Sequence, residues 1–136
     1  MRDNILTYLK ANPIQGFGVT EELPWDATDN PLYLKNMKQI YVNQPQTAQD
    51  PIFDTLDGGG AVDETTTVTV YVATDAKNLP PQYDKMVSTL RQARLLDLTQ
   101  GWRQRLTQVA TSYDYDALVT EFTFNFTKLI INKQEQ

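Results

Sequence analysis

The sequence contains neither cysteine nor histidine among its 136 residues. Without cysteine, the chain can form no disulfide and no thiolate metal site. Without histidine, it lacks the Ser-His-Asp and Cys-His catalytic arrangements, imidazole ligation of metals and the usual proton shuttle near neutral pH. An enzyme built on this chain would have to rely on carboxylates, lysine, tyrosine or a bound cofactor. The composition therefore disfavours an enzyme, and we expect no catalytic residue, no metal and no cofactor.

Long hydrophobic runs and an excess of positive charge are also missing. No run approaches the 18 or so apolar residues that cross a membrane, and the first residues, MRDNILTYLKAN, hold too short an apolar run for a signal peptide. The formal net charge is −5, so broad neutralisation of nucleic-acid phosphates is not expected. We expect a soluble, intracellular protein that binds no membrane and no specific nucleic acid.

The length favours a single domain, 1–136, with a core large enough to need no disulfide. Apolar spacing predicts a short helix at residues 3–11 and a long helix at residues 82–98, which begins after a Pro-Pro pair. Alternating or extended segments predict strands at residues 32–42, 65–73, 102–112 and 117–130. Strands on both sides of one long helix are typical of an α+β fold. We expect a mostly antiparallel sheet of about four strands, with one long and one short helix packed on one face.

Two of these strands show the clearest alternation between apolar and polar residues. Adjacent side chains of a strand point to opposite faces of the sheet, so every second residue shares one face. The inward positions are predicted to be Val68, Val70 and Val72 in one strand and Leu118, Phe122, Phe124 and Phe126 in the other.

Residues 43–64 are predicted to be a long acidic loop that binds a partner. Its stretch QDPIFDTLDGGGAVDE carries five acids, no cation and three consecutive glycines. Loops of more than about 15 residues in compact domains are usually functional or disordered. The apolar group of Ile52, Phe53 and Leu56 favours a binding loop, because a plain linker would not carry it. The acids of the segment are Asp50, Asp54, Asp57, Asp63 and Glu64.

Three other interpretations of this segment stay open. A calcium site would use the acids, but their spacing is not that of an EF-hand and no bidentate glutamate follows at the required distance. A phosphate-binding loop would use the glycines, but it needs a lysine and a following helix. The plainest alternative is a solvated, mobile loop.

The sequence YDYD, residues 113–116, lies between two predicted strands. We interpret it as a hairpin turn whose tyrosines pack at the edge of the sheet. A pair of carboxylates for acid-base chemistry is the alternative.

Arg91, Arg94, Arg103 and Arg105 form the basic cluster of the sequence. The first two lie three residues apart on the predicted helix, and the last two share a face of a predicted strand. The plain interpretation is a solvated surface. The more specific hypothesis places these arginines against the acidic loop of a neighbouring copy, because separated charge in identical subunits favours head-to-tail contacts that close into a ring.

The order of these features resembles a known family. A short helix, a strand and a long acidic loop lead into ETTTVTVYVATDAKNLP and one amphipathic helix; a polar strand and SYDYDALVTEFTFNF follow. Across roughly residues 1–130, this pattern is similar to the tail terminator proteins of long-tailed bacteriophages. The resemblance implies a structural virion protein that forms a six-membered ring, caps the tail tube at its head-proximal end, fixes tail length and forms the head-tail joining surface.

The resemblance also implies partners and a location. The partners would be further copies of the chain, the tail tube protein and the head-tail connector or neck proteins. The protein would be assembled in the host cytoplasm and reside in the virion tail, with no catalysis and no cofactor. Residues 65–73 and 117–130 match the core strands of the family, residues 82–98 its main helix and residues 43–64 its variable loop. The last residues, 132–136, are expected to fray.

The acids suggest a role within such a ring. If the carboxylates of Asp50, Asp54, Asp57, Asp63 and Glu64 face the channel, they would repel DNA and let it pass without specific binding. Alternative functions are a head-completion or neck adaptor protein of the connector, and a small non-enzymatic binding module such as a host-directed inhibitor. A carboxylate enzyme is the least favoured alternative.

Overall fold

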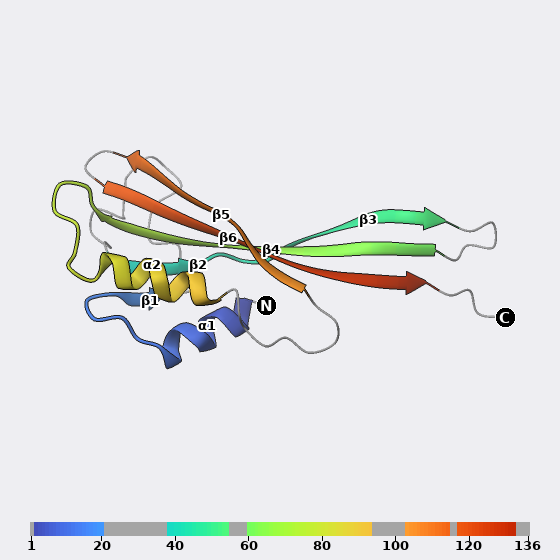
Figure 1. Ribbon diagram of the computed structural model, residues 1–136, viewed down its shortest axis with the longest axis horizontal. Coiled ribbons are helices and arrows are strands. Elements are labelled where there is room, and N and C mark those ends of the chain that lie inside the picture. The colour runs from blue at the N-terminus through green and yellow to red at the C-terminus, as the bar shows by residue number, and fades with distance from the viewer. Residues whose placement is uncertain (1, 21–37, 55–59, 94–102, 115–116, 133–136) are drawn as a thin grey trace.

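The computed structural model describes residues 2–20, 38–54, 60–93, 103–114 and 117–132. They form an α+β fold of two helices and a six-stranded, mixed but mostly antiparallel sheet (Figure 1). Neither described helix is long and apolar enough to cross a membrane. In chain order the elements are α1 (Arg2–Ala11), β1 (Gly18–Thr20), β2 (Gln39–Val42), β3 (Gln46–Asp54), β4 (Gly60–Asp75), α2 (Tyr83–Gln92), β5 (Arg103–Asp114) and β6 (Ala117–Asn132).

The two long strands β4 and β6 form the centre of the sheet. The strand order is β1-β2-β4-β6-β5, and β3 pairs with β4 outside this path. The pairing of β1 with β2 is parallel, and all others are antiparallel. Strand β2 pairs with Val70–Val72 of β4 and β3 pairs with Gly60–Thr67, so the two follow each other along the same side of β4.

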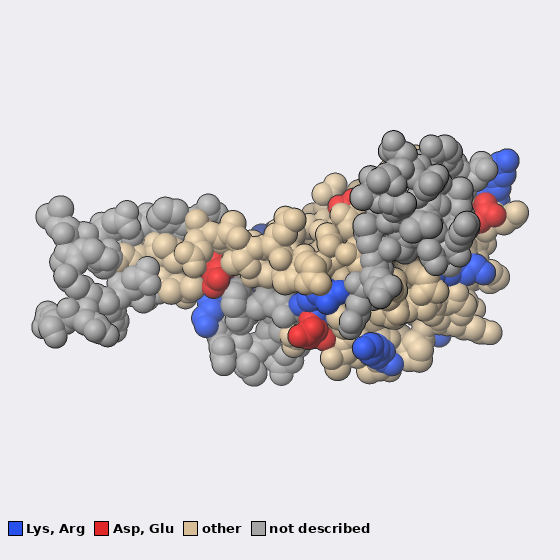
Figure 2. Space-filling view, turned by 180° about the vertical axis from the view of Figure 1, so that it is seen from behind, with Lys and Arg blue, Asp and Glu red and all other residues tan. Residues whose placement is uncertain are grey.

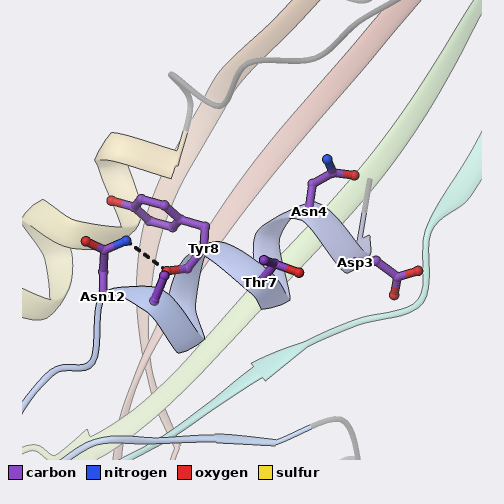
Figure 3. A pocket seen from close by; sticks show the side chains of 6 residues that line it. Asp3, Asn4, Thr7, Tyr8 and Asn12 are labelled. Carbon is purple, nitrogen blue, oxygen red and sulfur yellow. Dashed lines mark hydrogen bonds between the residues drawn. The ribbon is translucent and has the colours of Figure 1, made fainter.

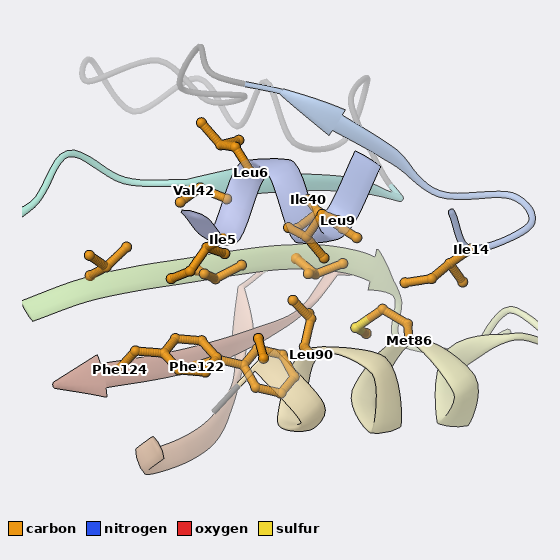
Figure 4. Packing of buried hydrophobic residues seen from close by; sticks show 14 of the residues in the cluster. Ile5, Leu6, Leu9, Ile14, Ile40, Val42, Met86, Leu90, Phe122 and Phe124 are labelled. Carbon is orange, nitrogen blue, oxygen red and sulfur yellow. The ribbon is translucent and has the colours of Figure 1, made fainter. Parts of the chain in front are cut away.

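The hydrophobic core lies between the helices and one face of the sheet (Figure 4). Helix α1 buries Ile5, Leu6 and Leu9, and helix α2 buries Met86 and Leu90. Burying an aliphatic side chain of this size stabilises the fold by roughly 1.5–3 kcal/mol. Both helices belong to one cluster with alternate residues of the strands, so they cover the same face. The strand residues of this cluster are Ile40, Val42, Val68, Val70, Val72, Phe122, Phe124 and Phe126.

Two tyrosine hydroxyls connect the helices to their surroundings. Tyr8 of α1 donates to the carbonyl oxygen of Thr89 in α2 at 2.9 Å. The hydroxyls of Tyr83 and Thr120 lie 2.9 Å apart and join α2 to β6. These bonds fix the positions of two helices of 10 residues each, which are too short to be stable alone.

A three-stranded arm extends from the sheet, formed by residues 49–54 of β3, 60–64 of β4 and 128–132 of β6. The arm begins just beyond Arg103, the first residue of β5, which pairs with Thr127 of β6. From Lys128 onward, β6 has no described partner in β5. Figure 1 shows the arm projecting past both helices. None of its residues belongs to the described core clusters.

The predicted elements agree with the structure where it describes them. The α+β class, the short first helix, the strand at 65–73 and the inward residues of β4 and β6 are confirmed. The expectation of about four strands is wrong, because β1 and β3 bring the sheet to six. The expected difference in helix length is not seen in the described part, where both helices have 10 residues. Residues 32–37, 94–98 and 133–136 of the predicted elements lie outside the described residues.

The prediction of a loop over residues 43–64 is wrong for most of that segment. Gln46–Asp54 form β3 and residues 60–64 begin β4, and the two strands pair antiparallel. The glycines and acids suggested a loop, but pairing on both sides of β4 supplies the backbone hydrogen bonds that a strand needs. Residues 55–59 lie outside the described part.

The expected hairpin between β5 and β6 is present, since Asp114 pairs with Ala117. The expectation that its tyrosines pack at the sheet edge is wrong for Tyr113, which is 76% exposed. The next two residues, 115–116, lie outside the described part.

Candidate functional site

Strand β3 is exposed where it enters the arm. The side chains of Gln46, Thr47, Ala48 and Gln49 are all exposed, although neighbours in a strand point to opposite faces. Consecutive exposure of this kind shows that no layer covers either face of β3 there. Natural proteins usually shorten, charge or cover such edge strands, because a bare edge offers unpaired backbone groups to other chains.

The hydrogen-bond pattern shows which backbone groups of β3 point outward. The amide of Asn43 donates to the carbonyl oxygen of Thr69 at 2.9 Å, so Thr69 points its backbone groups toward the β2 and β3 side of β4. Backbone direction alternates along a strand, so β3 residues opposite even-numbered residues of β4 point away from it. Thr47 pairs with Thr66 and therefore points its backbone amide and carbonyl to the open edge.

The same alternation applies on the other side of the sheet. Thr107 donates its hydroxyl to the carbonyl oxygen of Thr123 at 3.2 Å, so Thr123 points its backbone groups toward β5. Backbone direction alternates along β6, so Asn125 and Thr127 also point their backbone groups toward β5. Their partners in register are Arg105 and Arg103, with which they form backbone-hydrogen-bonded pairs. Gln104, between these arginines, points its backbone groups outward. Strand β5 is the last in the strand order of the described part.

The outer strands β3 and β5 lie at the same level of the sheet. At the base of the arm, β3, β4, β6 and β5 stand side by side, and the register connects their residues in three rows. We call these rows the base rows. They are Gln46-Thr67-Asn125-Arg105, Thr47-Thr66-Phe126-Gln104 and Ala48-Thr65-Thr127-Arg103.

Polar side chains hold the base rows on the face opposite the helices. Thr67 donates its hydroxyl to Oδ1 of Asn125 at 2.9 Å, and Nδ2 of Asn125 donates to Oγ1 of Thr107 at 3.4 Å. The hydroxyls of Thr65 and Thr127 lie 3.5 Å apart. These bonds link β4, β6 and β5 and keep these strands in register.

The structure separates the arginines that the sequence grouped. Arg103 and Arg105 stand in rows with Thr127 and Asn125, on the sheet face opposite the helices, and both are exposed. Arg91 is exposed on α2, which packs on the other face. Arg94 lies outside the described residues. Figure 2 shows cationic and anionic side chains interspersed on one face of the molecule.

The four predicted acids that the structure describes are spread along the arm. Asp63 and Glu64 are neighbours in β4, so they point to opposite faces, and both are half-buried. Asp50 and Asp54 lie in β3, and Asp57 lies outside the described residues. In the described part no group of three or more acids could hold a metal ion.

Two of the three apolar candidates lie toward the end of β3. Ile52 and Phe53 are in β3, where the register shifts between Pro51 and Phe53, and their side chains lie outside what the structure describes. Leu56 is also outside the described residues. Sequence reasoning missed Leu129, which is 53% exposed on β6. Its place after Asn125 and Thr127 in the alternation, on the polar face of the predicted strand, was the available signal.

A shallow pocket on the outer side of α1 offers a different candidate (Figure 3). Asp3, Asn4, Thr7 and Tyr8 line it, and Asn12 donates its amide to the carbonyl oxygen of Tyr8 at 2.9 Å. Burial raises the pKa of Tyr8 above its ordinary value. The Asn12 amide closes the end of the helix, so we interpret this surface as a helix cap.

No family model matches the chain, and comparison with curated proteins finds no significant similarity.

Proposed function

We propose that the protein is a structural assembly protein and serves as a tail terminator of a long-tailed bacteriophage. The observation that carries this proposal is the arm, which projects past the helices of the α+β body and contributes no residue to the described core clusters. Elements of this kind gain stability when they bind another chain. The resemblance in element order supplies the particular role.

In this role identical copies form a ring, a hexamer by the resemblance, at the head-proximal end of the tail tube. The arms contact the tail tube protein, and the opposite end of the ring contacts the connector or neck proteins. Leu79, which is 48% exposed, lies in the connection that follows β4, and Tyr113, which is 76% exposed, lies at the end of β5. They are suitable contacts for that second partner, because exposed large apolar side chains often mark protein interfaces.

The acids take a narrower role than the sequence suggested. Since Asp63 and Glu64 point to opposite faces of the arm, no more than one of them faces a central channel. Strand β4 therefore contributes one carboxylate per copy to a channel that repels DNA, while the other faces outward.

Electron microscopy of particles assembled without this protein tests the proposal. A terminator predicts overlong tails together with unattached, DNA-filled heads. Free tails of normal length with leaking heads would instead establish the alternative, a head-completion or neck adaptor. Normal virions would contradict both structural roles.

A further inference from the structure

We propose that two copies of the chain associate as a two-fold dimer through the outer edges of β3, in an antiparallel pairing centred on Ala48. The inference goes beyond the proposed function and does not depend on it. It names a second copy as the partner of this edge and specifies the register in which the two copies pair.

The outer edge that β2 and β3 share is occupied along β2. Strand β1 pairs with Gln39–Tyr41, and Nε of Arg2 donates to the carbonyl oxygen of Val42 at 3.0 Å. Within the described part, no strand pairs with the outer edge of residues 46–49, and the side chains of these residues are all exposed. We call residues 46–49 the edge window. It is the part of this edge that another chain can reach.

Two residues of the edge window, Thr47 and Gln49, point their backbone groups outward. Both stand opposite even-numbered residues of β4, and such residues of β3 point away from β4. Pro51 follows in the same alternation, but a proline has no backbone amide. Each copy therefore presents the amides and carbonyls of Thr47 and Gln49, and no further outward amide follows at Pro51.

The sequence around the edge window is close to symmetric about Ala48. Prolines lie three residues before it, at Pro45, and three residues after it, at Pro51. In an antiparallel pairing centred on Ala48, Thr47 of one copy stands opposite Gln49 of the other, and the two exchange amide-to-carbonyl hydrogen bonds. Pro45 stands opposite Pro51, so the ladder ends on both sides without an unpaired amide.

The prolines also select this register. If the pairing moves by two residues in one direction, the carbonyl of Gln49 faces Pro45. If it moves in the other direction, the carbonyl of Thr47 faces Pro51. Neither proline can donate a hydrogen bond, and unpaired backbone groups in a contact are costly. The pairing centred on Ala48 is therefore the register that satisfies every outward amide and carbonyl of the edge window.

The edge window carries no charge that would keep two copies apart. Its residues are Gln-Thr-Ala-Gln, whereas charged side chains, lysine above all, commonly protect an edge strand from pairing. Ala48 meets its own copy as a non-hydrogen-bonded pair, in which side chains come close, and its methyl group leaves room for this approach. The contact uses the same surface on both copies and closes after two, so it is separate from the head-to-tail contact between copies in a ring.

Single cysteines test the inference, because the chain has no cysteine of its own. Ala48→Cys places the two thiols at a non-hydrogen-bonded pair, whose Cα separation of about 4.5 Å suits a disulfide. The matched control, Gln46→Cys, changes an exposed residue on the same face of β3. Position 46 stands opposite position 50 of the other copy, so the two control thiols lie about 13 Å apart along the ladder, which no disulfide spans.

Both variants are oxidised as concentrated purified protein and separated on a non-reducing gel. A contact of this size forms weakly and reversibly, and the disulfide traps it. The inference predicts a covalent dimer from Ala48→Cys and little or none from Gln46→Cys. Equal yields from the two variants, or no dimer from Ala48→Cys, would overturn it.

A second pair of variants tests the contact without cysteines. Thr47→Pro removes an outward amide, which a proline on an edge strand can do without loss of an inner ladder bond. Thr47→Val keeps that amide and loses only the hydroxyl, which lies 3.0 Å from the hydroxyl of Thr66. Sedimentation equilibrium should show the dissociation constant of the dimer raised about tenfold or more by Thr47→Pro and unchanged by Thr47→Val. Equal behaviour of the two would overturn the inference.

Discussion

At the scale of single residues, the alternation of apolar and polar residues correctly predicted which side chains are buried at Phe122, Phe124 and Phe126. Alternation in the sequence predicted that they share a face, and all three are buried to 1% exposure or less. Their polar neighbours Thr123 and Asn125 lie on the other face, as predicted. A period of two suffices here because the strand has a core on one side and hydrogen-bonded polar groups on the other.

Phe122→Ala is expected to lower the free energy of unfolding by about 3–5 kcal/mol, because it removes a fully buried ring and leaves a cavity. Denaturant unfolding followed by circular dichroism measures the change. Tyr113→Ala is the matched control, since its side chain is 76% exposed; its effect should stay within about 0.5 kcal/mol. Equal losses in both variants would contradict the position of the core.

Tyr8 is expected to make stability fall at alkaline pH. Burial raises the pKa of its phenol in the folded state, so the folded protein favours the protonated form. This contribution is fully present below the pKa of the unfolded chain, near 10, and is lost as pH rises through the folded pKa.

Tyr8→Phe removes this titration together with the hydrogen bond to Thr89. The variant is expected to be less stable by about 0.5–1.5 kcal/mol at neutral pH. Its unfolding free energy should fall less steeply above pH 10 than that of the wild-type chain. If the free energies of unfolding of the two proteins fall equally steeply above pH 10, the pKa of the Tyr8 phenol does not change on folding.

At the scale of elements, pattern was reliable for α1, β4 and β6 and failed for β3. The first three bury one side against the core, so their apolar residues recur at the period of their structure. Strand β3 has no covered face at Gln46–Gln49, so no burial pattern marks it. Its pairing with β4 is a contact between backbones, and residues 51–53 add a register shift that side-chain alternation cannot indicate.

The arm is expected to be dispensable for folding of the body. Asp50 and Asp63 are partners in register, so replacing residues 51–62 by Asn-Gly closes a two-residue hairpin at that pair. None of the removed residues belongs to the described core clusters, so thermal unfolding should shift by only a few degrees. Loss of cooperative unfolding in this arm-truncated variant would show that the body depends on the arm.

At the scale of the whole molecule, charge and strand edges act together. The sequence indicated opposite charges in separate regions, but it could not show that Arg91 and Arg103 lie on different faces or that β3 and β5 form two edges of one sheet. Both facts depend on pairings between residues far apart in the chain. The distribution of charge in the sequence therefore suggested that copies contact one another. Only the structure shows on which strands and faces these charges lie.

Charge reversal tests the hypothesis that Arg103 contacts the acidic segment of a neighbouring copy. Arg103→Glu should weaken association of copies, because like charges then meet. Lys77→Glu makes the same change in charge at an exposed position at the other end of the body and should leave association unchanged. Sedimentation of the two variants and the wild-type chain at low ionic strength gives the comparison. Equal weakening by Arg103→Glu and Lys77→Glu would indicate a general effect of net charge.

The most direct test of the central claim is the distribution of tail lengths, measured by electron microscopy on particles made with the wild-type chain, without it and with the arm-truncated variant. The account predicts one uniform length with the wild-type chain and overlong tails in the other two cases, because a ring without arms cannot engage the tube. Tails of uniform, normal length with the folded arm-truncated variant would contradict it.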